Sequence, residues 1–550
     1  MSRNSFAELL NDLLDQNQIE ASYEAIRVRC SNDFQSFCEI FFPHYCKHPW
    51  NQFHLDCFEY YRTKADPARR VDCAPRGYAK STVKTLFKPV HDICYQLQKY
   101  ILFVAATKSQ SGEKLKDIRA EIFDNALLVN VYGIGFQNKR VNAESFEVTT
   151  PEGPVFLRSV SAGTEVRGMR YREHRPTKII LDDAEDSEEV LSEDQREKTA
   201  NWFFEVISKL GSEVTDIEIV GTVLHRDSLL MRLKRNPSYQ TTVYKSVQSW
   251  SDRQDLWQKW KDIYLNLDDP DRLAKSEKFY MEHEKDMLQG TSVLWPEKES
   301  YLDLMKELEE IGKRAFWKEK QNTPMPSTEA LFDNIWWYIE GTNDKGEEGF
   351  IIEKTGAFIR KSDTEAYGAM DPATGTSKIS KKKLDFTCIL GGYKDLKGRL
   401  FVDKDWTKRE KPTKQIRQIF ELNAMLDFTK FAIEENLFRG LLTENIVRER
   451  KRLENKRRKQ GIKGWGIKVP FYEIQNREKK TERIFTLEPK VNNGWILFNK
   501  ALSFEFMEQI QQFPSKEMHD DAPDTLEMLW GLINNRYKIS PVEIHAIGSR

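Results

Sequence analysis

The pattern of apolar and polar residues changes along the chain. Near the N-terminus apolar residues recur at helical spacing, which predicts an amphipathic helical segment. From about residue 50 to 230, short apolar runs alternate with longer helical patterns. The runs predict strands at Arg70–Ala74, Ile101–Ala105, Lys178–Leu181 and Ile217–Val220. This alternation is typical of an α/β domain with a mainly parallel sheet, whose ligand sites lie at the carboxyl ends of the strands.

A second α/β pattern begins near residue 363. Its apolar runs predict strands at Ala366–Met370, Phe386–Tyr393, Leu400–Lys404 and Lys430–Glu434, with a later helix at Ala522–Asn534. The first three strands can form an antiparallel meander with a turn at Asp395–Gly398. Charged helical sequence fills 250–320, and Pro324 and Pro326 then mark the start of a linker.

Two chemically different α/β domains follow from these patterns. We expect a helical segment at 1–45, the first α/β domain at 46–320 and a linker at 321–362. The second α/β domain is expected at 363–538, followed by a tail at 539–550.

The composition is that of a globular protein, with 39% hydrophobic and 31% charged residues. The longest apolar stretches, such as Ile101–Ala106, are far shorter than the ~20 residues that a membrane span needs. No signal peptide pattern is present, so we expect a cytoplasmic protein without a membrane partner. The 7 cysteines fit reduced thiols. No CxxC pair occurs, and we expect Cys38, Cys46 and Cys57 to be buried apolar residues rather than zinc ligands.

The net charge of −1 excludes a uniformly basic surface but not a local basic patch. The segment Arg448–Lys463 is such a patch, and it includes Arg457 and Arg458. It is either a solvated helical face or a surface that contacts nucleic-acid phosphates.

The segment Cys73–Thr82 follows a predicted strand and precedes a helical pattern, as a phosphate-binding loop does. In that interpretation Gly77 is part of the loop, Lys80 reaches the β- and γ-phosphates, and Ser81 or Thr82 helps to hold Mg²⁺. Ala74 and Ala79 occupy the two positions where the GxxxxGK[ST] pattern has glycine, so an ordinary loop with a surface lysine is the alternative.

An apolar strand ending in carboxylates supports the nucleotide interpretation. The run Lys178–Leu181 leads into Asp182 and Asp183, and Glu185 follows. Asp182 is the expected partner of Mg²⁺, and Asp183 or Glu185 would orient the attacking water. Carboxylates this close together are costly unless a cation lies among them.

Separated carboxylates in the second domain predict a metal-dependent nuclease. Cleavage of the RNase H type requires carboxylates from different strands around two Mg²⁺ or Mn²⁺ ions. Asp371 and Glu434 each end a predicted strand, and Asp521 begins the last helix, so these three are the expected primary ligands, with Asp520 and Asp524 in support. Asp385 is a weaker candidate, and a turn or a helix N-cap is the alternative for each of them.

A lysine cluster lies between the first two strands of that domain. Lys378, Lys381, Lys382 and Lys383 stand where a hairpin that grips DNA would lie, although a solvated loop explains them as well.

Taken in order, these motifs resemble those of the large terminase subunits of tailed phages. The loop Pro-Arg-Gly-x-x-Lys-Ser at 75–81 resembles their variant phosphate loop. Upstream, 50–54 corresponds to a segment that contacts adenine. The segment 167–176 leads into the acidic strand, and Gly221-Thr222 resembles the motif that couples hydrolysis to movement. Asp371, Glu434 and the late His519-Asp-Asp match the order of the nuclease motifs.

The resemblance covers residues 45 to 535 and implies particular roles. It implies that Gln52 contacts the base, that Arg76 contacts phosphate, that Arg167 is a possible arginine finger and that Thr222 couples hydrolysis to movement. It further implies a P-loop ATPase domain and an RNase H-like nuclease domain.

The resemblance also implies a packaging function. The chain would drive double-stranded DNA into a procapsid with ATP and Mg²⁺ and cut concatemeric DNA with two Mg²⁺ or Mn²⁺ ions. Its partners would be a portal protein, a small terminase subunit and further copies in a ring docked on the capsid. It would act in the host cytoplasm and be absent from the mature virion.

Three other functions compete with this one. The first is a DNA helicase or translocase with a non-catalytic C-terminal DNA-binding domain. The second is a stand-alone RNase H-like nuclease or recombinase with a degenerate N-terminal domain, and the third is a structural phage component.

Overall fold

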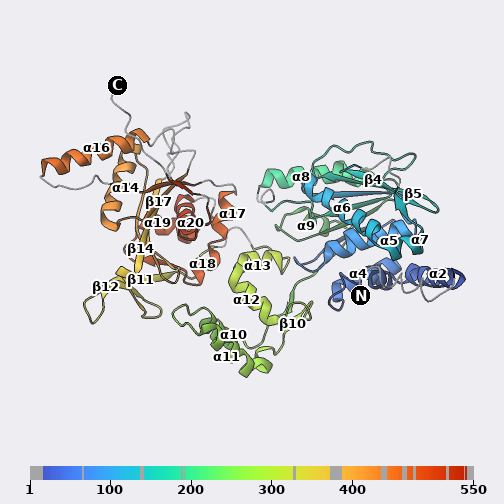
Figure 1. The fold of residues 1–550 in the computed structure, drawn as a ribbon, viewed down its shortest axis with the longest axis horizontal. Helices are drawn as coiled ribbons and strands as arrows, with labels where there is room; N and C mark the ends of the chain where they lie inside the picture. The colour runs from blue at the N-terminus through green and yellow to red at the C-terminus, as the bar shows by residue number, and fades with distance from the viewer. Residues whose placement is uncertain are drawn as a thin grey trace. The chain divides into compact units, whose positions relative to one another are not determined.

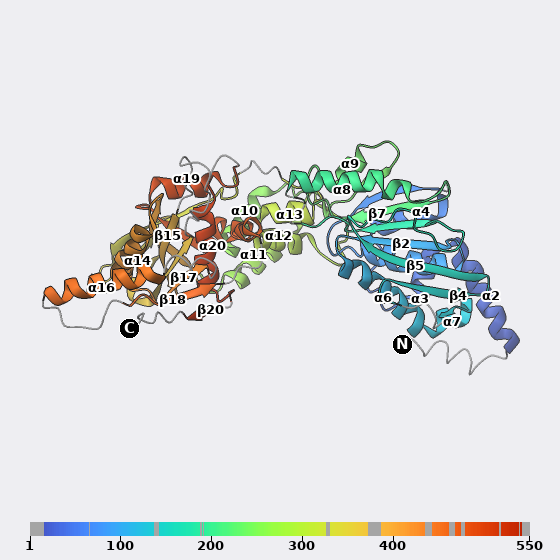
Figure 2. The ribbon, with the colours of Figure 1, turned by 90° about the horizontal axis from the view of Figure 1, so that it is seen from above.

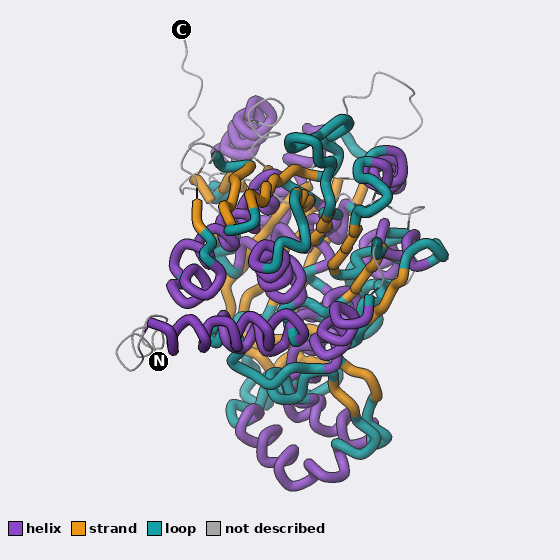
Figure 3. Tube along the Cα trace, turned by 90° about the vertical axis from the view of Figure 1, so that its right-hand side faces the viewer, coloured by secondary structure: helices purple, strands orange, loops and turns teal. Residues whose placement is uncertain are grey.

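The chain forms two compact units of α/β structure. The computed structural model describes residues 16–64, 67–136, 142–187, 190, 192–325, 330–371, 387–434, 443–460, 468–474, 479–515, 519–537 and 539–541. Unit 1 comprises Met1–Arg253, Leu288–Glu307 and Ala315–Met325, and unit 2 comprises Gln254–Met287, Leu308–Arg314 and Pro326–Arg550. Both units contain helices and strands; Figure 3 draws the helices in purple and the strands in orange. Within the described ranges, no helix combines the length and the apolar character that a membrane crossing requires.

Strands of the described part of unit 1 form one sheet in the order β3-β4-β5-β2-β6-β7-β1-β8. Their bounds are β1 (Arg69–Cys73), β2 (Tyr100–Ala105), β3 (Gly135–Phe136), β4 (Ser145–Thr150), β5 (Gly153–Ser161), β6 (Lys178–Asp182), β7 (Asp216–Gly221) and β8 (Gln240–Val243). The pairs from β5 through β8 are parallel, and β3-β4-β5 is antiparallel. The four strands that the sequence predicted are β1, β2, β6 and β7, and the mainly parallel sheet is confirmed.

Helices cover both faces of this sheet (Figure 2). One face packs against α2 (Gln16–Asn32), α3 (Phe34–Phe41), α4 (Gln52–Thr63), the π-helical turn η1 (Thr82–Phe87), α5 (Lys88–Cys94), α6 (Lys108–Asp124) and α7 (Ala126–Tyr132). The other face packs against α8 (Glu193–Glu205) and α9 (Leu229–Lys234). Cys38 and Cys57 are buried, as expected, and Cys46 is partly buried.

Capping boxes fix the starts of two helices near the candidate nucleotide site. The Asn51 side chain accepts a hydrogen bond from the His54 backbone at the start of α4, and Thr107 accepts one from Gln110 at the start of α6. In each case the side chain of the third helical residue returns a hydrogen bond to the cap. Unit 1 also contains a small antiparallel pair, β9 (Val247–Ser249) with β10 (Ser292–Val293).

Unit 2 contains a larger mixed sheet, whose described strands lie in the order β13-β12-β11-β19-β16-β15-β14-β17-β18-β20. Their bounds are β11 (Trp336–Thr342), β12 (Glu348–Ile352), β13 (Phe358–Arg360), β14 (Thr364–Asp371), β15 (Thr387–Asp395), β16 (Leu400–Lys408), β17 (Lys430–Glu434), β18 (Phe471–Ile474), β19 (Ile496–Asn499) and β20 (Ile539–Pro541). The antiparallel pairs β14–β15 and β15–β16 confirm the predicted meander, and β17 joins β14 in parallel. Gly398, with φ +85°, donates to the Asp395 carbonyl in the predicted turn.

Two helical layers cover this second sheet (Figure 1). The layer that contains α17 (Lys480–Phe485), α18 (Glu488–Asn492), α19 (Phe504–Gln512) and α20 (Asp521–Ile533) packs on one face. The layer of α14 (Pro412–Leu426) and α16 (Thr443–Lys459) packs on the other. The charged helical sequence predicted over 250–320 forms α10 (Gln254–Tyr264), α11 (Arg272–Met287), α12 (Tyr301–Ile311) and α13 (Lys313–Glu319).

Candidate functional site

The predicted phosphate loop joins β1 to η1 at the carboxyl edge of the parallel sheet. Two of its residues adopt left-handed backbone conformations, Gly77 with φ +86° and Ala79 with φ +54°. Glycine adopts that region freely, whereas a residue with a Cβ adopts it at a cost of roughly 1–2 kcal/mol. Ala79 therefore makes the turn that the commoner glycine would make.

Lys80 points from this loop toward the end of β7. Its Nζ donates a 2.7 Å hydrogen bond to Thr222 Oγ1 and lies 3.9 Å from Asp183 Oδ1. The backbone N–H of Thr222 donates to the same Asp183 oxygen at 3.2 Å. A Cβ on Gly221 would lie 3.2 Å from that oxygen, so the glycine permits the close approach of Asp183. The structure thus brings three predicted site residues together.

Asp182 is buried beside the phosphate loop and accepts hydrogen bonds from two hydroxyls and an ammonium. Ser81 Oγ lies at 2.9 Å, Thr85 Oγ1 at 3.0 Å and Lys114 Nζ at 2.9 Å. Ser81 is thus the hydroxyl that meets Asp182, while Thr82 begins η1. A serine hydroxyl beside a carboxylate offers the oxygen ligands that Mg²⁺ prefers, so these residues fit the ion.

The two candidates for orienting water differ in their surroundings. Glu185 Oε1 accepts a 2.8 Å hydrogen bond from the backbone N–H of Leu229, and Ile219, Leu229 and Leu230 line the cavity beside it. Burial raises the pKa of Glu185 to about 7. The Asp183 side chain is half exposed and lies near the Lys80 ammonium. Asp183 is therefore the better placed of the two to meet a water beside a bound phosphate.

His54 connects the predicted adenine segment to the phosphate loop. Its Nδ1 accepts from the Asn51 N–H at 3.2 Å, and its Nε2 lies 3.1 Å from the carbonyl oxygen of Tyr78. Burial lowers the pKa of His54 to about 4, so the ring is neutral and Nε2 carries the proton that it donates to Tyr78. This histidine holds the loop in place.

The other predicted residues of the nucleotide site lie in open surroundings. The Gln52 amide donates to Asp56 on its own helix at 2.6 Å. The backbone of Arg76 donates to the Glu319 carbonyl at 2.9 Å, and its side chain is exposed. Arg167 is exposed in the connection from β5 to β6.

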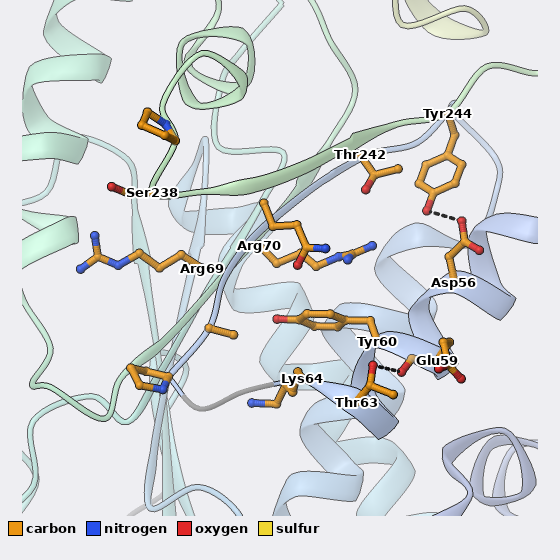
Figure 4. Close-up of a pocket in the computed structure, with 14 residues that line it drawn as sticks. Asp56, Glu59, Tyr60, Thr63, Lys64, Arg69, Arg70, Ser238, Thr242 and Tyr244 are labelled. Carbon is orange, nitrogen blue, oxygen red and sulfur yellow. Dashed lines mark hydrogen bonds between the residues drawn. The ribbon is translucent and has the colours of Figure 1, made fainter.

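A separate open cavity of about 710 Å³ lies at the other end of β1, between α4 and β8 (Figure 4). Most of its charged groups already have partners. Tyr244 donates to Asp56 at 2.8 Å, Lys64 contacts Asp216 at 2.6 Å, and the Arg70 guanidinium lies 4.3 Å from the centre of the Tyr60 ring. None of the residues predicted for nucleotide binding lines this cavity.

The carboxylates predicted for the nuclease converge in unit 2. Met370 on β14 lies opposite Ile433 on β17, so Asp371 and Glu434, which follow them, lie side by side on one face of the sheet. The helix α20 packs on that face and contributes Asp521 and Asp524. Burial raises the pKa of Asp524, and the like charge of Glu434 adds to the rise, against the opposing effect of Lys480 and Arg483.

A lysine lies among these carboxylates. Lys480 Nζ is 3.2 Å from Asp371 Oδ2 and 3.0 Å from Asp520 Oδ1, and it also contacts Asp521 and Asp524. Burial raises the pKa of Asp371 to about 7, with Lys480 opposing the rise and the like charges of Asp524 and Asp521 adding to it.

The carboxylate cluster can be assessed as a site for a divalent metal. Within the described ranges, no three His, Cys, Asp or Glu side chains are grouped closely enough to form a ready-made metal site. Lys480 and Arg483 already supply cations here, but carboxylate oxygens are the ligands that Mg²⁺ and Mn²⁺ prefer, so the chemistry of the residues present fits the metals.

The predicted DNA-binding residues divide between described and undescribed parts of the chain. Lys378, Lys381, Lys382, Lys383 and Asp385 lie outside the described residues. Arg457 and Arg458 lie in the last turn of α16. Earlier in that helix Arg450 pairs with Glu454 at 3.0 Å and Arg452 with Glu449 at 2.9 Å, whereas Lys456–Lys459 have no ion pair with another described residue. The last turn therefore offers unneutralised positive charge.

The sequence patterns did not predict four residues that lie near the two candidate sites. Thr85 lies one turn after Ser81, a helical spacing that could have identified it. Lys114, Lys480 and Arg483 lie far along the chain from the carboxylates that they meet, and no local pattern identifies them.

The chain is similar to solved structures of phage large terminases. One is the large terminase of a thermophilic bacteriophage, which matches 88% of this chain and 100% of that chain, with 9% identity and a TM-score of 0.45. The same protein in complex with ATP-gamma-S matches 88% and 99%, with 10% identity and a TM-score of 0.41. The HK97 bacteriophage large terminase matches 88% and 94%, with 11% identity and a TM-score of 0.28. No protein-family model and no curated protein matches the sequence.

Proposed function

We propose that the chain is a DNA-packaging ATPase and metal-dependent endonuclease of the terminase large-subunit type. The observation that carries the proposal is the arrangement of Lys80 and Ser81 against Asp182, Asp183 and Thr222 at the carboxyl edge of a parallel sheet. The acidic cluster of unit 2 supports the second activity.

The contacts of Lys80 suggest how hydrolysis couples to movement. In this proposal Lys80 leaves Thr222 to meet the γ-phosphate of ATP, and Thr222 at the end of β7 is released. Asp183 accepts a hydrogen bond from a water beside the γ-phosphate and orients that water for attack. Bound Mg²⁺ would reduce the phosphate charge. Arg76 would contact phosphate, Gln52 the base, and Arg167 the charge that develops during hydrolysis.

In the nuclease site, Asp371, Glu434 and Asp521 would hold the metals, with Asp520 in support. Two bound Mg²⁺ or Mn²⁺ ions would activate water and stabilise the leaving oxygen. Both oxygens of Asp524 contact cations, Lys480 and Arg483, so Asp524 would mainly orient these side chains. Phosphate contacts carry no base information, so cutting should show little sequence preference.

The proposal extends to domains and partners. The motor would lie within 46–320 and the nuclease within 363–538. The range 321–362, predicted as a linker, contributes β11, β12 and β13 to the sheet of unit 2, and 254–287 and 308–314 also belong to unit 2. The partners would be double-stranded DNA, a portal protein, a small terminase subunit and further copies in a ring on the procapsid, in the host cytoplasm.

Paired substitutions in the full chain test this proposal. Lys80→Ala should remove ATP hydrolysis and leave cutting of supercoiled plasmid in Mn²⁺, whereas Asp371→Ala should do the reverse. ATP hydrolysis without any cutting by the wild type would favour the translocase with a non-catalytic C-terminal domain. Cutting without nucleotide binding would favour the stand-alone nuclease.

A further inference from the structure

Lys480 occupies the centre of the acidic cluster in unit 2. Its ammonium lies 3.0 Å from Asp520 Oδ1, 3.2 Å from Asp371 Oδ2, 3.3 Å from Asp524 Oδ2 and 4.0 Å from Asp521 Oδ1. These carboxylates come from the end of β14 and from the start of α20. A position within reach of all four is also the position that a shared divalent ion would take.

The neighbouring arginine provides a contrast. Arg483 Nη2 lies 2.8 Å from Asp524 Oδ1, and the guanidinium also contacts Glu527, with only 4% of its side chain exposed. The Lys480 side chain is 33% exposed, begins α17 and carries its charge on a flexible four-carbon stem. Arg483 is thus held within the core, whereas the Lys480 ammonium lies at a partly exposed position on a flexible stem.

We propose that Lys480 is a built-in competitor of the nuclease metal. Its ammonium neutralises the carboxylates in the metal-free protein and leaves the cluster before a divalent ion binds there. The inference rests on the proposed function, because it takes Asp371, Glu434 and Asp521 as metal ligands. Lys480 thereby sets the metal concentration at which the nuclease becomes active.

Titration of the full chain with Mn²⁺ in the absence of nucleotide tests the proposal, with free Mn²⁺ followed by electron paramagnetic resonance. Lys480→Met keeps the apolar stem and removes the charge, so Mn²⁺ should bind at least about tenfold more tightly, equivalent to about 1.4 kcal/mol. Lys480→Arg, which keeps the charge, should bind Mn²⁺ as weakly as the wild type. An unchanged or weaker affinity in Lys480→Met would overturn the proposal.

Two further variants make the result specific. Lys500→Met removes an ion pair with Glu353 at 2.6 Å elsewhere in unit 2 and should leave Mn²⁺ affinity unchanged. Lys480→Gln provides a second neutral side chain if Lys480→Met fails to fold. In EDTA the neutral variants should melt below the wild type, and Mn²⁺ should restore their melting temperature, because unneutralised carboxylates repel one another.

Asp371→Asn separates failure of this inference from failure of the proposed function. If Asp371→Asn abolishes Mn²⁺ binding and Lys480→Met does not tighten it, Lys480 is no competitor although the metal site stands. If Asp371→Asn leaves Mn²⁺ binding intact, the proposed nuclease site itself is wrong, and the inference falls with it.

Discussion

Glu185 carries a carboxyl group whose ionisation opposes folding. In the unfolded chain its pKa takes the ordinary value of 4.5, and burial raises it to about 7 in the fold. Between these values the folded state binds more protons than the unfolded state does. The free energy of unfolding that Glu185 contributes therefore falls as the pH rises from 4.5 to about 7, and it is constant above that range.

Glu185→Gln should remove this pH dependence. The variant cannot ionise and still offers an oxygen to the Leu229 N–H, so it should gain stability relative to the wild type at about pH 8 and little at about pH 5. Calorimetry of the full chain measures this stability difference. The unfolding transition to follow is the one whose melting temperature a bound ATP analogue raises. As a control, Glu197→Gln removes a carboxylate whose pKa is lowered by the hydrogen bond from Arg232, so it should be relatively less stable at the higher pH. If the stability difference between Glu185→Gln and the wild type is the same at both pH values, Glu185 does not have a raised pKa in the folded protein.

The residues that come together at the candidate nucleotide site were largely predictable from the sequence. Ser81 meets Asp182 and Lys80 approaches Asp183 because a strand–loop–helix segment and an acidic strand end share one edge of a parallel sheet. The conformation of Ala79 was not predictable, because alanine rarely adopts a positive φ and only the surrounding loop requires it. The position of Lys480 among the acids depends on the packing of α17 against α20, which local sequence does not encode.

Charged side chains join β1, β6 and β7 to η1 and α5 beneath the sheet of unit 1. Lys178 Nζ lies 2.8 Å from Glu218 Oε1 and 2.9 Å from Asp92 Oδ2. Lys84 Nζ lies 2.5 Å from Asp72 Oδ2 and 3.5 Å from Glu218 Oε2. All five residues are buried. Since η1 continues directly from the phosphate loop, this network fixes the helix that the loop precedes.

Lys178→Met should destabilise unit 1 strongly. The substitution leaves Asp92 and Glu218 buried with fewer cations, and loss of one partner from a buried pair typically costs about 3–5 kcal/mol. Chemical denaturation measures the change in the free energy of unfolding, followed on the transition that responds to nucleotide. Arg62→Met breaks an exposed pair with Glu59 on α4 and should cost less than about 1 kcal/mol. Equal effects of the two substitutions would contradict a structural role for the network.

Elements with continuous apolar runs were predictable, and short edge strands were not. The runs that become β1, β2, β6, β7, β14, β16 and β17 are buried along most of their length, so their apolar residues mark them directly. By contrast β8 and β13 lie at the edges of their sheets and are largely half-exposed; β8 is mostly polar, and β13 has only three residues. Such strands form because a neighbour offers free hydrogen-bonding groups, which a sequence pattern does not record.

At the scale of the whole molecule, a net charge of −1 means that the proposed affinity for DNA would have to come from local patches. The last turn of α16 is the best described candidate, because its four basic residues have no ion pair with another described residue, whereas Arg450 and Arg452 earlier in the helix are paired with glutamates. If Arg457 and Arg458 each contact one phosphate, binding releases counterions from both positions.

The double variant Arg457→Ala/Arg458→Ala should therefore weaken binding of the full chain to duplex DNA and make it less sensitive to salt. The slope of log affinity against log salt should fall in magnitude by about 1.8, since each phosphate contact contributes about 0.9. Fluorescence anisotropy with EDTA present measures binding without cutting. The matched variant Arg450→Ala/Arg452→Ala removes the same charge from residues that glutamates already neutralise, so its slope should change less. Equal slopes for the two double variants would mean that total charge, and not the last turn of α16, determines DNA binding.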